Sequence, residues 1–193
     1  MTNNDYEALC LYFKQTGKSN TEKTLRAAAR RAGERNVETV LISSTSGDAG
    51  LKAAEIINDR NLIVVTHSTG FVRRDFQQMP EDRRRELEGR GVKVLTCQHA
   101  LGGVGRAVRK KLDTYQTEEI IAYTLRLFGE GTKVALEIAL MAADAGLVST
   151  QKPCISVGGT GQGVDTALLI QPAHAQDFFE LKVLEIIAKP RVS

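Results

Sequence analysis

TVLISSTSGDAGLKAAEIINDRNLIVVT, residues 39–66, consists of two short apolar runs with a helical pattern between them. Residues 39–43 and 62–66 carry aliphatic and β-branched side chains at successive positions, which is typical of strands buried on both faces. Residues 49–57 repeat apolar side chains at helical spacing. Because a strand, a helix and a strand in this order form a crossover between parallel strands, the stretch predicts an α/β fold.

The same alternation continues along the chain. Further strands are predicted at residues 8–13, 92–96, 154–157 and 166–170, and further helices at residues 21–35, 80–89, 117–128 and 132–145. No linker, repeat or low-complexity tract divides them. We therefore expect one domain over residues 1–193, a three-layer αβα sandwich with a mainly parallel sheet. The last segment, FFELKVLEIIAKP (178–190), predicts a short turn and then an edge strand closed by Pro190.

The composition is that of an ordinary soluble globular protein, with 42% hydrophobic and 25% charged residues and a formal net charge of +3. The longest apolar stretch is broken by Glu137 and Asp144, and no membrane interaction is expected. Basic residues cluster at 83–85 and 106–111, but acidic residues alternate with most of the basic ones and aromatic residues are scarce, which disfavours nucleic-acid binding. Three cysteines without paired spacing indicate a reducing, cytoplasmic compartment, and neither they nor the three histidines form a metal-binding pattern.

Ligands of such sheets bind outside the carboxyl ends of the strands. The first loop there, KQTGKSNT (14–21), lacks the phosphate-binding pattern of nucleotide hydrolases, because Tyr12 stands where that pattern requires glycine. Ser19 and Glu22 are spaced as a capping box, so the loop either caps a helix or contributes to an anion site. In the second case the contacts would come from Gly17, Lys18, Asn20 and Thr21.

The second loop, SSTSGDAG (43–50), is richer in donors. Four consecutive hydroxyl residues lead into Gly47 at a predicted helix start, where unpaired N–H groups and the helix dipole favour anions. We expect a phosphate or another anion at Ser44, Thr45, Ser46 and Gly47. Thr45 with Asp48 is the alternative, a second capping box.

Three more loops follow strands on the same side of the sheet: THSTGF (66–71), TCQHALGGVG (96–105) and GGTGQG (158–163). GGVG does not match the dinucleotide-binding pattern, and no acidic ribose ligand follows at the expected distance, so a Rossmann NAD site is disfavoured. Phe71 either packs in the core or lies against a ligand ring. The candidate contacts in these loops are Thr66, His67, Gly70, Phe71, His99, Gly159 and Thr160.

Several blocks together resemble a known family: CLYFKQTGKSNTEKTL, ISSTSGDAGLKAAE, VVTHSTGF, QHALGGVGRA, LEIALMAADAGL and GGTGQGVDTALLIQPAH. They are similar to the stand-alone archaeal and bacterial proteins related to the C-terminal α/β domain of pyruvate kinase, over residues 9–191. The resemblance implies a three-layer αβα fold with a mixed sheet, in which a late strand runs antiparallel. In pyruvate kinase this domain is regulatory, and the loop matching residues 43–50 holds a phosphate of an allosteric sugar bisphosphate.

The resemblance implies no pyruvate kinase activity, since the phosphoryl-transfer machinery lies in a barrel that this chain lacks. Flavin mononucleotide (FMN) is the ligand associated with the stand-alone relatives, which leads us to expect a phosphate-bearing small molecule here. A flavin-dependent oxidoreductase and a regulatory module that senses a sugar phosphate are the alternatives. A homo-oligomer is also compatible with the mostly apolar helix at residues 132–145.

Two other arrangements are weaker candidates for chemistry. Cys97 and His99 point the same way in an extended segment, but a thiolate nucleophile also needs a base within hydrogen-bond reach. Glu137 and Asp144 share a helix face as a carboxylate pair would, although a polar stripe on a buried helix is the preferred interpretation, and Thr132 is a candidate cap for that helix.

Overall fold

In the computed structural model, which describes residues 5–191, the stretch that begins at residue 39 forms the predicted strand–helix–strand unit. It consists of β2 (Thr39–Ser43), α2 (Asp48–Ile56) and β3 (Asn61–Val65). β2 and β3 pair in parallel, with Leu41 opposite Ile63. The prediction for this unit is confirmed to within one residue at each boundary.

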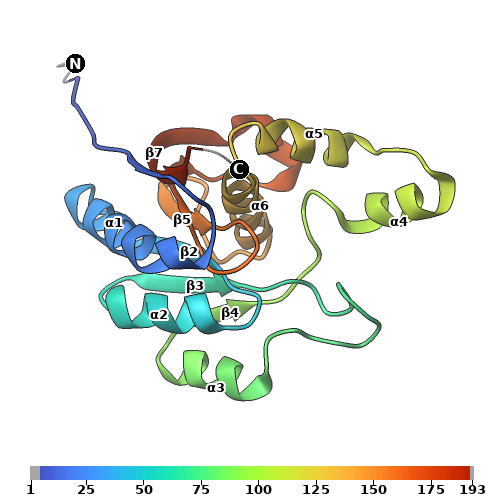
Figure 1. Cartoon of the computed structure of the whole chain (residues 1–193), viewed down its shortest axis with the longest axis horizontal. Coiled ribbons are helices and arrows are strands. Elements are labelled where there is room, and N and C mark those ends of the chain that lie inside the picture. The colour runs from blue at the N-terminus through green and yellow to red at the C-terminus, as the bar shows by residue number, and fades with distance from the viewer. Residues whose placement is uncertain (1–4, 192–193) are drawn as a thin grey trace.

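The remaining strands of the described chain extend this pair into a seven-stranded sheet with the order β1-β7-β6-β5-β2-β3-β4 (Figure 1). They are β1 (Leu11–Phe13), β4 (Lys93–Leu95), β5 (Cys154–Gly158), β6 (Thr166–Gln171) and β7 (Lys182–Pro190). β6 is antiparallel to both of its neighbours, and the other strand pairs are parallel. The strands β1 to β5 therefore run in the same direction, and their carboxyl ends, with the predicted loops, lie at the same end of the sheet.

Helices cover both faces of the sheet and make three layers (Figure 1). One face carries α1 (Thr21–Glu34), α2 and α3 (Glu81–Gly89), and the other carries α6 (Glu130–Asp144), which packs on β2, β5 and β6. Outside α6 lie α5 (Thr117–Arg126) and the 3-10 helix η2 (Ala175–Glu180). The three-layer α/β fold with a mainly parallel, mixed sheet is thereby confirmed.

Alternate side chains of each central strand enter the two cores. Val40 and Ile42 face the core beneath α1 and α2, while Leu41 between them faces the core beneath α6. All three are fully buried, as the uninterrupted apolar run predicts for a strand covered on both faces. None of the helices in residues 5–191 combines the length and apolar character needed to cross a bilayer.

The prediction of an edge strand at the C-terminal end is wrong. β7 lies inside the sheet, between β6 and the short strand β1, which forms the edge. Pro190 fits in this strand because neither neighbour needs its missing N–H. On the β1 side the N–H of Arg191 donates to the carbonyl of Phe13 at 2.9 Å, and on the other side the pairing with β6 stops at Ala188.

One helix was not predicted. α4 (Gly103–Leu112) begins within the glycine-rich segment after β4 and projects from the body of the molecule beside α5 (Figure 1). Gly105 is its one buried residue. Because α4 packs on α5 and not on the sheet, it needs few apolar residues at helical spacing. Its glycines also have low helix propensity, so the sequence did not predict a helix here.

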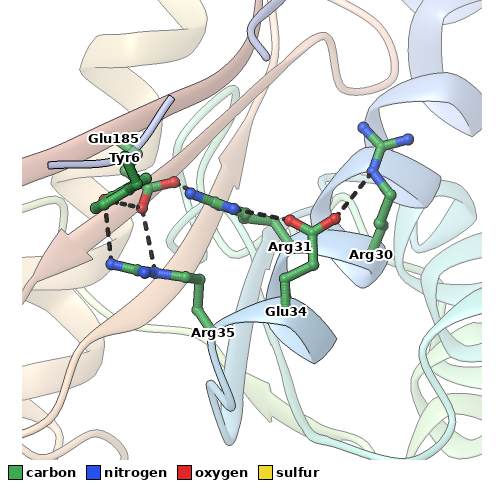
Figure 2. Close-up of polar contacts among 6 residues, drawn as sticks. All are labelled: Tyr6, Arg30, Arg31, Glu34, Arg35 and Glu185. Carbon is green, nitrogen blue, oxygen red and sulfur yellow. Dashed lines mark hydrogen bonds and ion pairs between the residues drawn. The ribbon is translucent and has the colours of Figure 1, made fainter. Parts of the chain in front are cut away.

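A polar network fastens the N-terminal segment to β7 and α1 (Figure 2). The hydroxyl of Tyr6 donates to Glu185 at 2.6 Å, and the guanidinium of Arg35 lies over the Tyr6 ring. Glu185 also forms ion pairs with Arg31 and Arg35. Since only 8% of the Glu185 side chain is exposed, this carboxylate depends on its partners for neutralisation.

Candidate functional site

A cavity of about 1060 Å3 opens at the carboxyl ends of the strands, and residues from all five predicted loops line it. The loops converge because β1 to β5 run in the same direction. Ten residues of the predicted set face the cavity: Lys18, Thr21, Ser44, Thr45, Ser46, Thr66, His67, Phe71, His99 and Gly159.

Five predicted residues, Gly17, Asn20, Gly47, Gly70 and Thr160, lie outside the cavity lining. The N–H of Gly17 is used within the fold, since it donates to the buried carboxylate of Asp165 at 2.8 Å. The Asn20 amide likewise bonds the carbonyl of Gln15. Both residues therefore build the first loop, and Lys18 and Thr21 are the ones turned to the cavity.

Two of the outlying glycines have backbone roles. Gly47 precedes α2 with φ of 91°, and a Cβ there would lie 3.0 Å from the Cβ of Arg83. Gly70 has φ of 82° in a turn where its N–H bonds the carbonyl of Phe76. Both conformations are left-handed and favour glycine, so these residues shape their loops from behind the lining. For Thr160, which lies beyond the tip of β5, the structure gives no polar contact within residues 5–191.

Neither predicted capping box forms. α1 follows Asn20 and α2 follows Gly47, and neither Ser19 nor Thr45 caps them. In the first turn of α2 the N–H groups of Asp48 and Gly50 are instead accepted by the hydroxyls of Ser46 and Ser44. In residues 5–191 the N–H groups of Thr45, Ser46 and Gly47 have no hydrogen-bond acceptor. The loop that leads into α2 thus presents these three N–H groups next to the cavity, together with the positive end of the helix dipole.

Cations outnumber unpaired anions around the cavity. Each lining carboxylate in the described chain has a cationic partner: Glu22 with Arg26, Asp48 with Arg83, Glu130 with Arg126, and Glu137 with Lys133. Lys18 and Arg106 line the cavity without a carboxylate within 4 Å among residues 5–191. These two side chains leave the site with uncompensated positive charge, which suits an anionic ligand.

The floor of the cavity contains a buried ion pair on α6, between Lys133 and Glu137. Glu137 also accepts the N–H of Leu101 at 3.0 Å, and His99 Nδ1 lies 3.6 Å from its carboxylate. Burial alone would raise the pKa of Glu137, but the contact with His99 and the charge of Lys133 outweigh it and bring the pKa to about 2. Glu137 is therefore an anion whose carboxylate is already engaged with Lys133, His99 and the N–H of Leu101.

The position of Glu137 agrees with neither interpretation of its helix from the sequence, a carboxylate pair with Asp144 or a polar stripe. Asp144 is the last residue of α6, two turns beyond Glu137, and accepts the N–H of Ala175, so the two carboxylates do not act as a pair. Glu137 is not part of a solvent-facing stripe, because only 4% of its side chain is exposed. Thr132 does not cap α6 either, since the helix starts at Glu130 and the Thr132 hydroxyl donates back to Phe128.

Three rings from two loops pack together at the wall of the cavity. The ring of Phe71 lies 4.1 Å from that of His67 and 4.9 Å from that of His99, centroid to centroid, and the guanidinium of Arg106 lies 4.8 Å from Phe71. Gln78 contacts His67 Nδ1 at 2.9 Å. Phe71 is half-buried in this cluster and also lines the cavity. Its place is therefore intermediate between the two predicted ones, packing in the core and lying against a ligand ring.

A cysteine nucleophile is not supported. Burial raises the pKa of the Cys97 thiol, and the charge of Asp144 raises it further. Cys97 packs against the apolar core beneath α6, and the base that a thiolate would need, His99, is engaged with Glu137.

Several lining residues were missed from the sequence, among them Gln78, Arg106, Arg126 and Lys133. Lys133 could have been predicted from the sequence. It precedes Glu137 by four residues on a mostly apolar helix, and two opposite charges at that spacing indicate a buried ion pair. Arg106 was hidden in a basic run that looked solvated, because nothing in the sequence shows that α4 brings one of its cations to the cavity.

No protein-family model matches the sequence. Solved structures similar to this chain include chains of pyruvate kinase from Cryptosporidium parvum, one of them in complex with ADP. Their sequence identities are 13%, 12% and 14%, their TM-scores 0.44, 0.42 and 0.41, and the matches cover 82%, 82% and 80% of this chain. The chain spans 24% of the length of each of these enzymes. At this similarity, the assignment of the fold rests on the strand order and register described above.

Proposed function

We propose that this protein binds a phosphate-bearing small molecule in the cavity at the carboxyl ends of the strands, and that FMN is the ligand. One observation carries the proposal: a single cavity joins the N–H groups and hydroxyls of the loop before α2 with two cations, Lys18 and Arg106, that have no carboxylate within 4 Å among residues 5–191. The motif resemblance to the stand-alone relatives of the pyruvate kinase C-terminal domain supports the same assignment. It is the source of the flavin identity.

The phosphate belongs at residues 44–46. The N–H groups of Thr45, Ser46 and Gly47, the hydroxyls of Thr45 and Ser46, and the dipole of α2 supply the donors that a phosphate dianion takes in place of water. The Ser44 hydroxyl already accepts the N–H of Gly50 at 3.2 Å, and its proton remains available to an anion. Lys18, on the first loop, also lines the cavity and adds charge with no carboxylate within 4 Å among the described residues.

The remainder of the ligand has room and a matching surface. Small-molecule sites are usually about 300–1,000 Å3, and the volume of about 1060 Å3 accommodates a mononucleotide. The non-phosphate end would extend toward the cluster of His67, Phe71 and His99, whose aromatic edges suit a planar ring. An oxidoreductase would follow only if a bound flavin also exchanges electrons with a donor.

A sugar phosphate is the second candidate, and the charged floor favours it. Arg126 at the end of α5, and Glu130 and Lys133 on α6, place cationic donors and a carboxylate acceptor beside the cavity, as sugar hydroxyls require. In that case the protein would be a regulatory module that changes stability or partner affinity on binding, without turnover.

The first experiment is an absorption spectrum of the purified protein before and after addition of FMN. A shift of the flavin bands, and a rise in melting temperature of about 5–10 °C at a ligand concentration about 100 times Kd, are the expected results. Riboflavin, which lacks the phosphate, should bind more weakly. Stabilisation by a sugar bisphosphate with no flavin shift would replace FMN by the second candidate, and no response to either would overturn the proposal.

The loop is tested by Ser46→Asp, which places a carboxylate beside the unpaired N–H groups and should repel a phosphate. The control is Ser149→Asp, in the turn before β5 and thus at the opposite end of the sheet. There the hydroxyl oxygen accepts the N–H of Gln151, as a carboxylate also would. FMN affinity should fall at least tenfold in the first variant and stay unchanged in the second; equal affinity in both would place the phosphate elsewhere.

A further inference from the structure

The strong hydrogen-bond acceptors of the cavity are almost all occupied. The four lining carboxylates are paired with cations, and Glu137 in addition accepts a backbone N–H. One ring nitrogen is different. His67 Nε2 has no hydrogen-bond partner among residues 5–191, yet it is not one of the side-chain atoms sealed away from solvent, and its ring lines the cavity.

Contacts of both its ring and its backbone carbonyl hold His67 in place. His67 Nδ1 lies 2.9 Å from Gln78 Oε1, and the His67 carbonyl accepts bonds from the Thr66 hydroxyl at 2.8 Å and the Gln77 amide at 3.1 Å. The ring also packs on Phe71. The Gln78 amide is oriented with its oxygen toward Nδ1, and a carbonyl oxygen only accepts; this orientation assigns the proton of the neutral ring to Nδ1 and a lone pair to Nε2.

The surroundings keep this ring neutral near pH 7. Burial lowers the pKa of His67 first, and the charges of His99 and Arg106 lower it further, against the opposing effects of Gln78 and Glu137. His99 and Glu137 approach from the segment after β4 and from α6, and Arg106 from α4. The neutral ring, with its proton directed at Gln78, therefore keeps Nε2 as an acceptor on a residue that lines the cavity.

We infer that His67 Nε2 accepts a hydrogen bond from an N–H donor at the non-phosphate end of the ligand, so the site selects a phosphate ester that carries a neutral ring N–H, as in an imide. This inference rests on the proposed function and assigns a specificity-determining residue to the same cavity. The isoalloxazine ring of FMN has one such imide N–H. A flavin methylated at that nitrogen keeps the phosphate and the ring but loses the donor, and so isolates the contact.

The test compares FMN with its N3-methyl derivative on the wild type, on His67→Ala and on a control, His174→Ala. His174 is exposed beside the C-terminal end of α6, where it contacts Asp144, and it is not among the residues that line the cavity. We expect the wild type and the control to bind FMN about tenfold more tightly than the methylated flavin, as one hydrogen bond predicts, and His67→Ala to bind both equally. FMN affinity of the wild type should also fall in acid as Nε2 gains a proton. Equal affinity of the wild type for the two flavins would overturn the inference while leaving the proposed function intact.

A second measurement applies if neither flavin binds, an outcome that would reject the flavin proposal. 15N NMR of the histidine rings in the free protein then decides the state of His67. A neutral ring with its proton on Nδ1 at pH 7 would support an acceptor at Nε2 for another donor-bearing ligand. A proton on Nε2, in the neutral or the charged ring, would overturn the inference. The same spectrum of His67→Ala identifies the signal and shows whether that variant is folded.

Discussion

Glu137 is neutralised by its neighbours to an unusual degree for a residue in the middle of an apolar helix. It has contacts with Lys133, His99 and the N–H of Leu101. The other ten buried residues of α6 are small or apolar except for Thr132. A buried pair of this kind contributes little net stability over an apolar pair of similar volume, but removal of one partner leaves an isolated charge. The pair therefore has a role in orienting His99 and the segment 99–101.

Substitution of one partner should cost more than substitution of both. Lys133→Met leaves Glu137 with no cation in direct contact and is expected to lower the free energy of unfolding by about 3–5 kcal/mol. The double variant Lys133→Met with Glu137→Leu should recover most of this loss. Urea denaturation of the wild type, the single variant and the double variant measures both the loss of stability and its recovery. A double variant no more stable than the single one would mean that packing, and not the charge, sets the cost.

The loop between β5 and β6 packs tightly against the loop after β1, and this contact closes one side of the cavity. Val164 donates its N–H to the Thr21 hydroxyl at 3.2 Å, and Asp165 accepts the N–H of Gly17. A Cβ at Gly163 would collide with Thr21 and lie 2.7 Å from the Cα of Lys18. The position of Lys18 in the cavity thus depends on a glycine far away in sequence.

Gly163→Ala should therefore displace Lys18 and reduce phosphate-ligand affinity as well as stability. Gly161→Ala is the matched control, because Gly161 has φ of 76°, close to the 70° of Gly163, but has no atom within 4 Å of the added Cβ. Both variants carry the same left-handed strain of about 1 kcal/mol, and only the first adds a steric conflict. Calorimetric melting and ligand titration measure the difference. Equal effects of the two substitutions would show that the loops can separate without consequence.

α4 is the element least supported by the rest of the molecule. It buries Gly105 alone, and its contacts are with α5, including an ion pair of Arg109 with Glu119 at 2.7 Å. Elements with few buried apolar contacts open at low free-energy cost. We expect limited trypsin digestion to cut first within residues 106–111, before the sites in α1 and α6.

Bound ligand changes this expectation in a defined way. Arg106 belongs to α4 and also lines the cavity, so a phosphate-bearing ligand that engages it should slow the first cut. Mass spectrometry of the early fragments identifies the site. First cuts in α1 or α6 would contradict the ranking of the helices.

Acid stability of the whole molecule depends on carboxylates whose pKa is low in the folded state. Glu137 has a pKa of about 2, and the pKa of Glu185 is also lowered, because bonds from Arg31 and Tyr6 outweigh the effect of burial. A group with a lowered folded pKa stabilises the protein above its unfolded pKa, and this contribution is lost as pH falls through the folded pKa. The loss due to Glu137 is expected between about pH 4.5 and about pH 2.

Glu185→Gln tests this for the network in Figure 2, which joins three separate parts of the chain. We expect the substitution to lower the free energy of unfolding by about 2 kcal/mol at pH 7, as for hydrogen bonds to a charged group, and by less at pH 3, where the wild-type carboxylate begins to lose its advantage. Glu38→Gln, in an exposed pair with Lys152, is the control and should change stability little at either pH. The same loss for Glu185→Gln at both pH values would contradict an electrostatic origin.

Most elements of the fold could be predicted from local patterns, and the exceptions share a cause. The strands at residues 39–43 and 61–65 are apolar at successive positions because each is covered on both faces, and that pattern is visible without any structure. α4 gave no such pattern because it does not cover the sheet. The place of β7 depended on whether a three-residue strand near the N-terminus would pair with it, which is a long-range event.

The predicted site residues follow the same division. The amino-acid sequence was enough to place hydroxyl and glycine loops at the carboxyl ends of parallel strands, because strand direction and loop position follow from the order of the elements. It was not enough to tell which groups in those loops remain unpaired. Gly17 loses its N–H to Asp165, and Glu137 gains Lys133 and His99, only when the chain is folded. Hydrogen bonds and burial between distant residues leave Lys18, Arg106 and His67 available in the cavity, and such contacts exist only in the assembled molecule.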